Sequence, residues 1–479
     1  MSEAGDLVVV GAGPAGMAAA ATALHGGLRV TLLDAGPAPG GQFWRRPVRT
    51  AGPAAARAAD PRHGRRTYRA LSAALSAHRR TGRLTLLTDH HAWTAARAED
   101  GFTVHAVDRG RAPEETAVAL RAPALLVATG AYDRQLPFPG WDLPGVLTAG
   151  GLQALLKGGG VPAGARVVLG GTGPFLLPVA AALAAGGAKV AAVCEASGPS
   201  AWVRRPGPLL RCPARWAEAA GYAAALARHR VPVRTRTAIT AAEGTGRVAA
   251  VRTALLDADG SPLPGTEHTI AADTVGVGWG FVPQLDLLVT LGCPLADAGD
   301  GSMAAAVDGG QRTGVPGLYA AGETCGVGGA ALAVGEGRLA AVSVLADLGA
   351  PGRPNPRRLA AGRAAVARHR AFARAVARAH PLPPGWSSWL TDDTPVCRCE
   401  EVTAGAVRSV CADGSAADHR QVKQLTRAGM GWCQGRMCGP AVHGLAAPGQ
   451  PYAPAERLIA TPLTLGALAG PGEPPSVPS

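Results

Sequence analysis

Residues 6–34, DLVVVGAGPAGMAAAATALHGGLRVTLLD, decide the fold of this chain. Leu7 to Val10 is a continuous apolar, β-branched run, as expected of a strand buried on both faces. It leads into a GxGxxG turn at residues 11–16 and then an alanine-rich helix. A second apolar run, Arg29 to Leu33, ends at Asp34. The stretch therefore predicts a dinucleotide-binding βαβ unit at the start of an α/β fold.

Each part of this turn has a separate task in binding a dinucleotide. Gly11 permits the tight turn, Gly13 lets backbone N–H groups approach a pyrophosphate, and Gly16 lets helix and strand pack closely. The helix N-terminus directs its partial positive charge at the pyrophosphate, and the acid that ends the second strand can accept hydrogen bonds from a ribose. The residues predicted to form this cradle are Gly11, Gly13, Pro14, Ala15, Gly16 and Asp34.

Residues 165–195, ARVVLGGTGPFLLPVAAALAAGGAKVAAVCE, repeat this pattern and predict a second dinucleotide-binding domain. Its candidate nucleotide-binding residues are Gly171, Gly173 and Glu195. The fingerprint is imperfect, because Leu176 replaces the third glycine and should keep the helix further from the strand. Glu195 would repel the 2′-phosphate of NADPH. We expect a domain retained for structural reasons, with NADH binding possible but doubtful.

Composition bounds the class of protein. The chain has 479 residues, 47% hydrophobic and 17% charged, and we expect two or three globular domains. The formal net charge of +13 comes almost entirely from arginines scattered among alanines. The densest basic stretch, Arg353 to Arg378, is typical of the solvated face of a helix. We therefore expect no nucleic-acid partner. An acidic protein is a better candidate than nucleic acid as the partner of these basic residues.

Targeting signals are weak. The first strand begins within a few residues of Met1, and we expect no signal peptide. The apolar stretch from Leu176 to Val193 contains Lys189 and favours a helix, a turn and a strand over a transmembrane segment. Nine cysteines without a secretory segment indicate the reducing cytoplasm, and metal ligation or free thiols rather than disulfides.

Four of these cysteines are grouped near the C-terminus, as C-x-C at Cys397 and Cys399 and C-x4-C at Cys433 and Cys438. The spacing predicts a four-thiolate site. Zinc sites usually use C-x2-C or a slightly longer knuckle, whereas thiolates from short glycine-flanked loops suit an iron–sulfur cluster. Zinc remains the competing interpretation. Cys411, between the two pairs, has no partner in the pattern.

Three further loops resemble those of the thioredoxin-reductase-like flavoproteins, which have two dinucleotide-binding domains. They are Gly-Gly-Gln at 40–42, Ala-Thr-Gly at 128–130 and Ala-Gly-Glu at 321–323. The resemblance implies FAD in the first domain and adds Gly41, Gln42, Thr129, Gly130, Gly322 and Glu323 to its contacts. Glu323 departs from the usual Asp of the class. The chain has no Cys-x-x-Cys, so we do not expect disulfide reductase chemistry.

The cysteine segments, CRCEEVT and GMGWCQGRMCGP, resemble the bacterioferritin-associated-ferredoxin-type [2Fe–2S] domain. Across nearly the whole chain, the sequence resembles the flavoprotein α subunits of bacterial opine oxidases, hydrogen cyanide synthase and heteromeric proline or hydroxyproline dehydrogenases. This implies a [2Fe–2S] cluster and a partner β subunit of the amino-acid-oxidase type that oxidises the substrate. The chain itself would relay electrons to an acceptor that the sequence does not identify. We expect no catalytic acid–base residue here.

The predicted architecture is α/β, with two Rossmann-like domains and a small helical [2Fe–2S] domain. Residues 1–140 and 275–350 form the FAD domain, 145–274 the second dinucleotide-binding domain, 351–390 a helical linker, 391–445 the cluster domain and 446–479 a tail. Two other functions stay open. One is a self-sufficient NADH-dependent FAD/iron–sulfur reductase, and the other is a non-catalytic redox or iron sensor on a flavoprotein scaffold.

Overall fold

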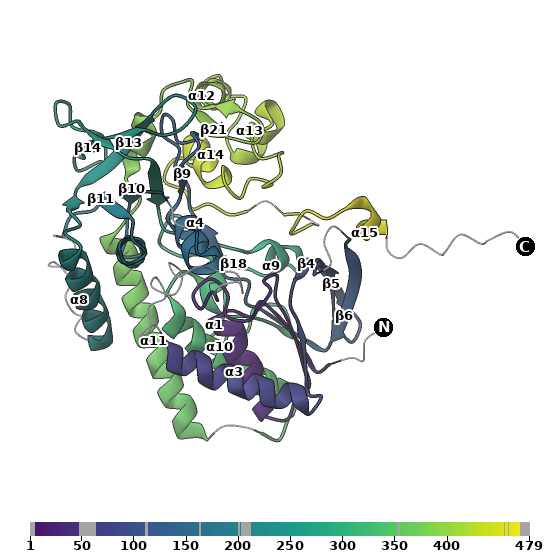
Figure 1. Cartoon of the computed structure of the whole chain (residues 1–479). Helices are drawn as coiled ribbons and strands as arrows, with labels where there is room; N and C mark the ends of the chain where they lie inside the picture. Colours follow the sequence, from purple (N-terminus) through teal and green to yellow (C-terminus); the bar gives the residue numbers. More distant parts are fainter. Residues whose placement is uncertain are drawn as a thin grey trace, which may run out of the picture.

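The computed structural model (Figure 1) has two Rossmann-like domains below a small, mostly helical C-terminal domain. The structure describes residues 5–46, 64–110, 114–161, 164–199, 202, 212–352, 355–454, 456–457 and 459–469. The end of the predicted tail, from residue 470, lies outside these residues.

The first domain is built on a five-stranded parallel sheet in the order β20-β7-β1-β2-β3. The strands are β1 (Leu7–Val10), β2 (Val30–Leu33), β3 (Leu84–Leu87), β7 (Ala124–Val127) and β20 (Leu318–Ala320). Every residue of β1 is buried, and its side chains alternate between two cores. The buried, uninterrupted apolar strand predicted at the start of the chain is confirmed, because both faces of the sheet are covered.

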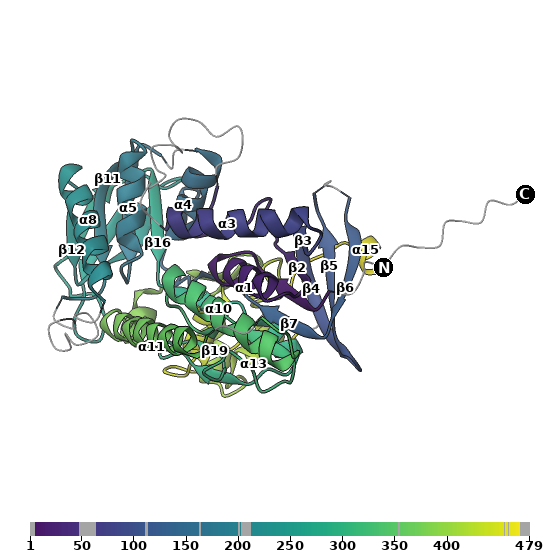
Figure 2. The same cartoon turned by 90° about the horizontal axis from the view of Figure 1, so that it is seen from below.

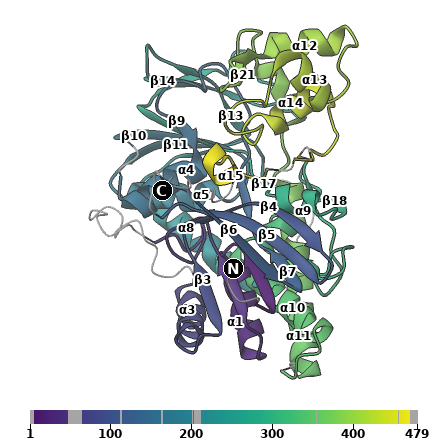
Figure 3. The same ribbon diagram turned by 90° about the vertical axis from the view of Figure 1, so that its right-hand side faces the viewer.

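Helices cover one face of this sheet and strands the other. Figure 2 shows α1 (Pro14–His25), α3 (Arg65–Arg80) and α10 (Ala330–Asp347) side by side, and they share one core. On the other face lies an antiparallel sheet, visible in Figure 3, of β4 (His90–Ala98), β5 (Gly101–Asp108) and β6 (Thr116–Ala122). Phe102 and Val104 of β5 pack there against β1 and β7.

The second domain repeats this plan. Its parallel sheet has the order β12-β11-β10-β16-β9, and a three-stranded antiparallel sheet covers one face. The parallel strands are β9 (Val146–Thr148), β10 (Arg166–Gly171), β11 (Lys189–Glu195), β12 (Val233–Thr235) and β16 (Thr274–Gly278). The antiparallel strands are β13 (Thr237–Glu243), β14 (Ala250–Leu255) and β15 (His268–Ala271), and the helices are α4 (Ala149–Ala154), α5 (Leu176–Ala185) and α8 (Pro213–Arg228). The predicted duplication of the βαβ fold is thus present.

The chain crosses between the two domains through a pair of short antiparallel strands. β8 (Ala131–Asp133) leaves the first domain and β17 (Phe281–Pro283) returns to it. The boundary predicted at residue 275 falls inside β16, which pairs with β10 and β9 of the second sheet. The glycine-rich apolar run there belongs to the second domain, and the return comes only after Gly278. The first domain resumes with α9 (Asp286–Thr290), β18 (Leu295–Asp297) and β19 (Met303–Ala305).

Helix α11 (Pro356–Ala379) is more than a linker. It packs along α10 and runs up beside the second domain (Figures 1 and 2). The chain then forms the C-terminal domain, with β21 (Pro395–Cys397), β22 (Val402–Thr403), α12 (Ala404–Ala412), α13 (His419–Thr426) and α14 (Gly439–Ala446). The following segment returns to the first domain, where the Ala460 N–H donates to Trp93 O, and it ends in α15 (Leu465–Ala469).

Tryptophans join the C-terminal domain to the second domain. The indole N–H of Trp141 donates to Pro395 O at 2.6 Å, and that of Trp389 donates to Gly260 O at 3.0 Å. The Trp389 ring also packs on Trp279, with centroids 5.3 Å apart. Buried tryptophan rings, two of which, Trp141 and Trp389, also donate a hydrogen bond across the boundary, fix this junction. Among the described residues, no helix is long and apolar enough to cross a membrane.

Candidate cofactor sites

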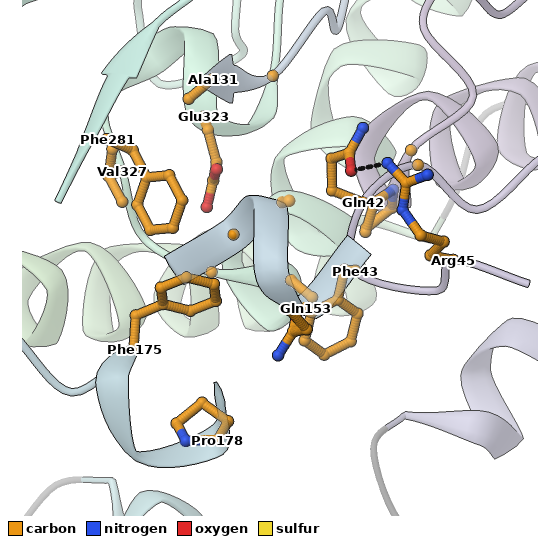
Figure 4. Close-up of a pocket in the computed structure, with 18 of the residues that line it drawn as sticks. Gln42, Phe43, Arg45, Ala131, Gln153, Phe175, Pro178, Phe281, Glu323 and Val327 are labelled. Atoms are coloured by element: carbon orange, nitrogen blue, oxygen red, sulfur yellow. Dashed lines mark hydrogen bonds between the residues drawn. The ribbon is translucent and has the colours of Figure 1, made fainter. Parts of the chain in front are cut away.

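One large cavity of about 2960 Å³ runs between the two Rossmann-like domains. Its walls include the glycine turns that follow β1 and β10, the loop at residues 41–46, and one side of α11. In the close-up of Figure 4, Gln42 and Arg45 meet on one side of the pocket. Phe175 and Phe281 make an edge-to-face contact in the same pocket, with centroids 4.9 Å apart. The cavity therefore reaches both predicted nucleotide sites.

The first glycine turn has the geometry that a pyrophosphate needs. Gly11 has φ +103°, and a Cβ there would overlap the Ala128 carbonyl oxygen. A Cβ on Gly16 would overlap the Gly11 carbonyl oxygen, so the helix can approach the strand only with glycine at this position. By contrast, a Cβ on Gly13 would meet no atom within 4 Å. This space is open above the N-terminus of α1, which begins at Pro14, as expected of an anion site.

Asp34 lies beside the same turn. Its carboxylate accepts hydrogen bonds from the Ala12 N–H at 2.5 Å and the Gly36 N–H at 2.8 Å. Burial raises the pKa of this carboxyl group, and the two N–H groups oppose the rise. Two donors leave other lone pairs of a carboxylate available. The group is therefore placed to brace the turn and also to accept from a ribose.

The Gly-Gly-Gln loop folds back over the turn. The Gly40 N–H donates to Ala12 O at 2.8 Å, and a Cβ on Gly41 would lie 2.9 Å from Gly13 Cα. Gln42 then lines the cavity and accepts from Arg45. The loop thus lies against the open space above Gly13.

Thr129 and Gly130 line the cavity where β7 ends. The Thr129 hydroxyl donates to Gln284 O, and the Gln284 N–H donates to Gly130 O, both at 2.9 Å. Gly130 has φ +81°, and a Cβ on it would meet no atom within 4 Å. Two hydrogen bonds therefore fix this crossing to the returning chain, and the cavity side of Gly130 stays open.

Gly322 and Glu323 follow β20 on the same cavity wall. A Cβ on Gly322 would lie 2.9 Å from the Ala15 Cβ, which again requires a small residue. Figure 4 shows the Glu323 side chain within the pocket. Burial raises the pKa of the Glu323 carboxyl group, and the Gly329 N–H and the charge of Arg370 oppose the rise. The longer side chain that replaces the usual Asp thus reaches the cavity.

The sequence analysis missed a buried ion pair behind this wall. Glu336 of α10 is 1% exposed, accepts from the Gly322 N–H at 3.0 Å, and pairs with Arg370 of α11. Arg370 also donates to Gly326 O at 2.7 Å. The solvated face expected for the arginine-rich helix is therefore wrong at this position. The available signal was the single acid of the mostly apolar 330–345 segment, because a buried charge needs a partner.

The second glycine turn has a different geometry. Gly171 has φ +143°, and a Cβ there would overlap Gly278 O. Gly173 has φ +100°, and the nearest atom to its Cβ position is the Cβ of His380, at 4.0 Å. Leu176 is fully buried at the position of the third glycine, and α5 begins there. In the first domain the helix begins two residues earlier, at Pro14.

Glu195 of the second domain is held by donors of its own chain. It accepts from the Gly173 N–H at 2.9 Å, the Thr172 hydroxyl at 3.0 Å and the Ser197 N–H at 2.9 Å. His380, just beyond α11, lies 3.3 Å away through Nδ1, and its Nε2 is 3.1 Å from the Trp202 indole nitrogen. Because an indole N–H only donates, Nε2 accepts and Nδ1 carries the proton toward Glu195.

The four predicted cysteine ligands come together in the C-terminal domain. Their thiols form a chain of contacts in which Cys438 lies between Cys397 and Cys433, and Cys433 contacts Cys399. The Gly429 N–H points at the Cys397 sulfur at 3.5 Å. Cys397 and Cys438 are buried, and Cys399 is exposed. Two loops that are about 30 residues apart in sequence thus present four sulfurs to one another.

The contacts among the four thiols shift their pKa values in opposite directions. Hydrogen bonding with Cys438 lowers the pKa of Cys397 to about 6 and that of Cys433 to about 5, whereas the pKa values of Cys438 and Cys399 are raised. Thiolates are the form that binds metal. Partial burial raises the pKa of Cys411 on α12.

Among the described residues, no three Cys, His, Asp or Glu side chains surround one ion position.

Comparison with protein families gives two matches. Residues 5–343 match the family "Pyridine nucleotide-disulphide oxidoreductase", and residues 395–447 match the "BFD-like [2Fe-2S] binding domain". The second match contains all four clustered cysteines.

Curated relatives resemble nearly the whole chain. An opine oxidase subunit of Rhizobium meliloti (strain 1021) is 36% identical, over 92% of this chain and 92% of its own length. The hydrogen cyanide synthase subunit HcnB of Pseudomonas aeruginosa is 33% identical, over 90% of each chain. The sarcosine oxidase alpha subunit of Rhizobium meliloti is 28% identical, with 97% of this chain matched to 42% of that one.

Two solved structures share the fold. The L-proline dehydrogenase from P. horikoshii superposes with a TM-score of 0.66 at 19% identity, covering 97% of this chain and 79% of that one. The thioredoxin reductase from T. acidophilum superposes with a TM-score of 0.52 at 22% identity, covering 72% of this chain and 99% of that one.

Proposed function

Since the chain belongs to the pyridine nucleotide-disulphide oxidoreductase family, and is an FAD-dependent oxidoreductase with a [2Fe–2S] domain, we propose that it is an electron-relay subunit. In this proposal a separate protein of the amino-acid-oxidase type oxidises an amino acid, imino acid or opine. This chain then passes the electrons through its flavin and cluster to an acceptor. The observation that supports it best is the clustering of four thiols in one chain with a large cavity that includes the first glycine turn.

We assign the FAD site to the walls around the open space above Gly13. The N-terminus of α1 and the turn from Gly11 to Gly16 would hold the pyrophosphate, and Asp34 would accept from the adenosine ribose. Gly41, Gln42, Thr129, Gly130, Gly322 and Glu323 line the rest of the cavity and would surround the ribityl chain and the ring. When bound, FAD supplies two-electron acceptance with one-electron release.

The cluster is assigned to Cys397, Cys399, Cys433 and Cys438. The four thiols contact one another, and the Gly429 N–H directed at Cys397 would stabilise the charge of a sulfur ligand. Unpaired thiols throughout the nine cysteines suit a reducing compartment, and we place the chain in the cytoplasm on that chemistry.

The need for a partner is inferred from the relatives, which are named as subunits of opine oxidase, hydrogen cyanide synthase and sarcosine oxidase. Acidic side chains do line the cavity, among them Asp133, Asp300 and Glu323, and Glu323 lies in the loop assigned to the flavin. Because the relatives are subunits, we assign substrate oxidation to the partner and no substrate acid–base residue to this chain.

An anaerobic spectrum of the purified chain, recorded before and after adding NADH, tests this function. We expect flavin and cluster bands that NADH does not bleach, and that bleach when an amino-acid-oxidising partner and its substrate are added. Absence of either band would contradict the proposal. Cys433→Ser should remove the cluster absorption and leave FAD bound, because Cys433 is not among the residues that line the cavity.

A second function, an NADH-dependent reductase, has one observation in its favour. The cavity is continuous from the first glycine turn to Glu195 and His380 of the second domain. Prompt bleaching by NADH alone would establish this function instead. We rank it second because Glu195 already accepts three hydrogen bonds from its own domain.

A further inference from the structure

Arg436 lies in the loop between two of the clustered cysteines, and its side chain leaves the C-terminal domain. It donates to Asp286 Oδ1 at 3.0 Å and to Ala460 O, and its other terminal nitrogen lies 3.3 Å from Cys433 O. Asp286 is 5% exposed and Arg436 is 19% exposed. One guanidinium thus ties the backbone of a cluster ligand to a buried carboxylate of the first domain.

Asp286 is the first residue of α9, and it is two residues from the flavin-side crossing. Gln284 makes both hydrogen bonds that fix Thr129 and Gly130. The path from Cys433 through Arg436 and Asp286 to Gly130 therefore consists of hydrogen bonds and short backbone segments. This connection is direct, whereas the tryptophans attach the C-terminal domain to the second domain.

Two tyrosines fill the space beside this ion pair. Tyr132 follows Gly130 by two residues and lines the cavity. Burial raises the pKa of the Tyr132 hydroxyl. Tyr452 and Asp286 add to this rise and Arg436 opposes it, which places all three groups close to Tyr132. The Tyr452 hydroxyl lies 2.5 Å from the Cβ position of Gly439, the residue after Cys438. Buried rings and the ion pair together leave little room for the cluster loop to move relative to the flavin wall.

We propose that Arg436 and Asp286 are positioning residues that hold the cysteine cluster at a fixed separation from the flavin, and so set the rate of electron transfer between them. The inference rests on the proposed relay function. Each transfer removes one electron from the reduced flavin and adds one to the oxidised cluster. Because the cluster holds one added electron, the acceptor of the proposed relay would have to re-oxidise it before a second transfer could complete the re-oxidation of the flavin, whose protons would pass to solvent. A buried pair suits this task, because loss of either partner leaves an uncompensated charge that must rearrange.

The test measures internal electron transfer in the full chain loaded with FAD and cluster. The flavin is reduced by a light flash with EDTA as the electron donor, and the appearance of the paramagnetic reduced cluster is followed by rapid-freeze EPR. Arg436→Gln and Asp286→Asn should keep the visible spectrum and iron content but slow the transfer by more than twofold, because a cluster loop that is no longer tied to Asp286 can lie further from the flavin wall. Arg436→Lys should recover part of the rate.

The matched control is Arg427→Gln. Arg427 also belongs to the C-terminal domain, but it is 69% exposed and pairs with Glu400 of the same domain at 2.9 Å. Its loss should leave the transfer rate unchanged. A rate in both Arg436→Gln and Asp286→Asn within twofold of the unsubstituted chain would overturn the inference. Loss of the cluster in both variants would also overturn it, because the pair would then serve cluster assembly. If the unsubstituted chain shows no transfer at all, the relay function itself fails.

Discussion

The two Rossmann-like domains share one plan and differ at the turn that would meet a nucleotide. In the first, α1 begins directly after Gly13 and the space above that residue is open. In the second, α5 begins two residues later, at Leu176. The N-terminal turn of α5, with its partial positive charge, is therefore displaced from the position where a pyrophosphate would lie.

The acidic residues that end the second strand of each βαβ unit, Asp34 and Glu195, also make the second turn less available to a nucleotide than the first. Asp34 reaches the N–H of Ala12, the second residue of its glycine turn. Glu195 is one methylene longer and reaches the Gly173 N–H, which corresponds to the pyrophosphate-facing Gly13. The second domain thus satisfies with its own carboxylate a donor that the first leaves for a ligand. We propose that these two differences make the second turn a poorer nucleotide site than the first, while the architecture of the duplicated fold is kept.

We expect the largest effect from placing a leucine, as at Leu176 of the second turn, at the equivalent Gly16 of the first turn. Gly16→Leu places a side chain where the Gly11 carbonyl oxygen lies, and we expect a destabilisation of about 3 kcal/mol together with loss of FAD. Flavin absorbance per chain and urea unfolding would measure both effects. Leu176→Met, which keeps the volume, should cost less than about 1.5 kcal/mol. An intact flavin content in Gly16→Leu would contradict the role given to this glycine.

Gly13→Val separates binding from folding. The φ of Gly13 is −72° and its Cβ position is open, so the apo protein should fold normally while the side chain fills the pyrophosphate position. We expect at least a tenfold loss of FAD affinity, or about 1.4 kcal/mol, measured by flavin titration of the apo protein. Gly173→Val should strain the backbone by about 1–3 kcal/mol, because its φ is +100°, and leave flavin content unchanged. Equal flavin loss in both variants would refute the assignment of FAD to the first turn.

Replacing each of the two acids by the other tests whether the length of the acidic side chain distinguishes the two glycine turns. Glu195→Asp should lose its reach to Gly173 and His380 and destabilise the chain by about 2 kcal/mol, with FAD retained. Asp34→Glu should mainly weaken FAD binding, by roughly tenfold, the effect of one hydrogen bond to a charged group. Denaturant unfolding and flavin titration would distinguish the two outcomes, and reversed effects would show that the second domain is the ligand site.

The smallest expected effect is that of His380→Ala. The side chain contacts Glu195 and Trp202 across the entrance to the second turn, and its removal should cost about 1 kcal/mol or less. If His380 helps to close the turn, NADH binding measured by fluorescence should tighten by up to about tenfold, because Glu195 loses one competing partner. No change in NADH affinity would mean that the hydrogen bonds within the second domain suffice to close it.

Much of the fold follows from the sequence, because its signals are local. The apolar strands, the glycine turns and the closing acids at Asp34 and Glu195 lie within single βαβ units, where neighbouring residues decide the structure. The clustering of Cys397, Cys399, Cys433 and Cys438 was also predictable, because either metal chemistry that suits the two short motifs, an iron–sulfur cluster or zinc, brings four thiolates together.

The remaining features depend on contacts between distant segments. Arg370 was expected to be solvated, yet it pairs with Glu336, which lies 34 residues earlier. The pair of Arg436 and Asp286 joins positions 150 residues apart. An arginine gives the same signal in sequence whether its partner is water or a buried carboxylate, so only the packed structure distinguishes them.

The position of β20 has a consequence for the timing of synthesis. This edge strand of the first sheet pairs with β7 and comes from residues 318–320, while β1 is made first. At bacterial rates of about 5–20 residues per second, roughly 15 to 60 seconds pass between the emergence of the two strands. The glycine turn at residue 11 must therefore wait, without the Gly322 wall, until the whole second domain has left the ribosome. We expect flavin to be taken up late, by a nearly completed chain.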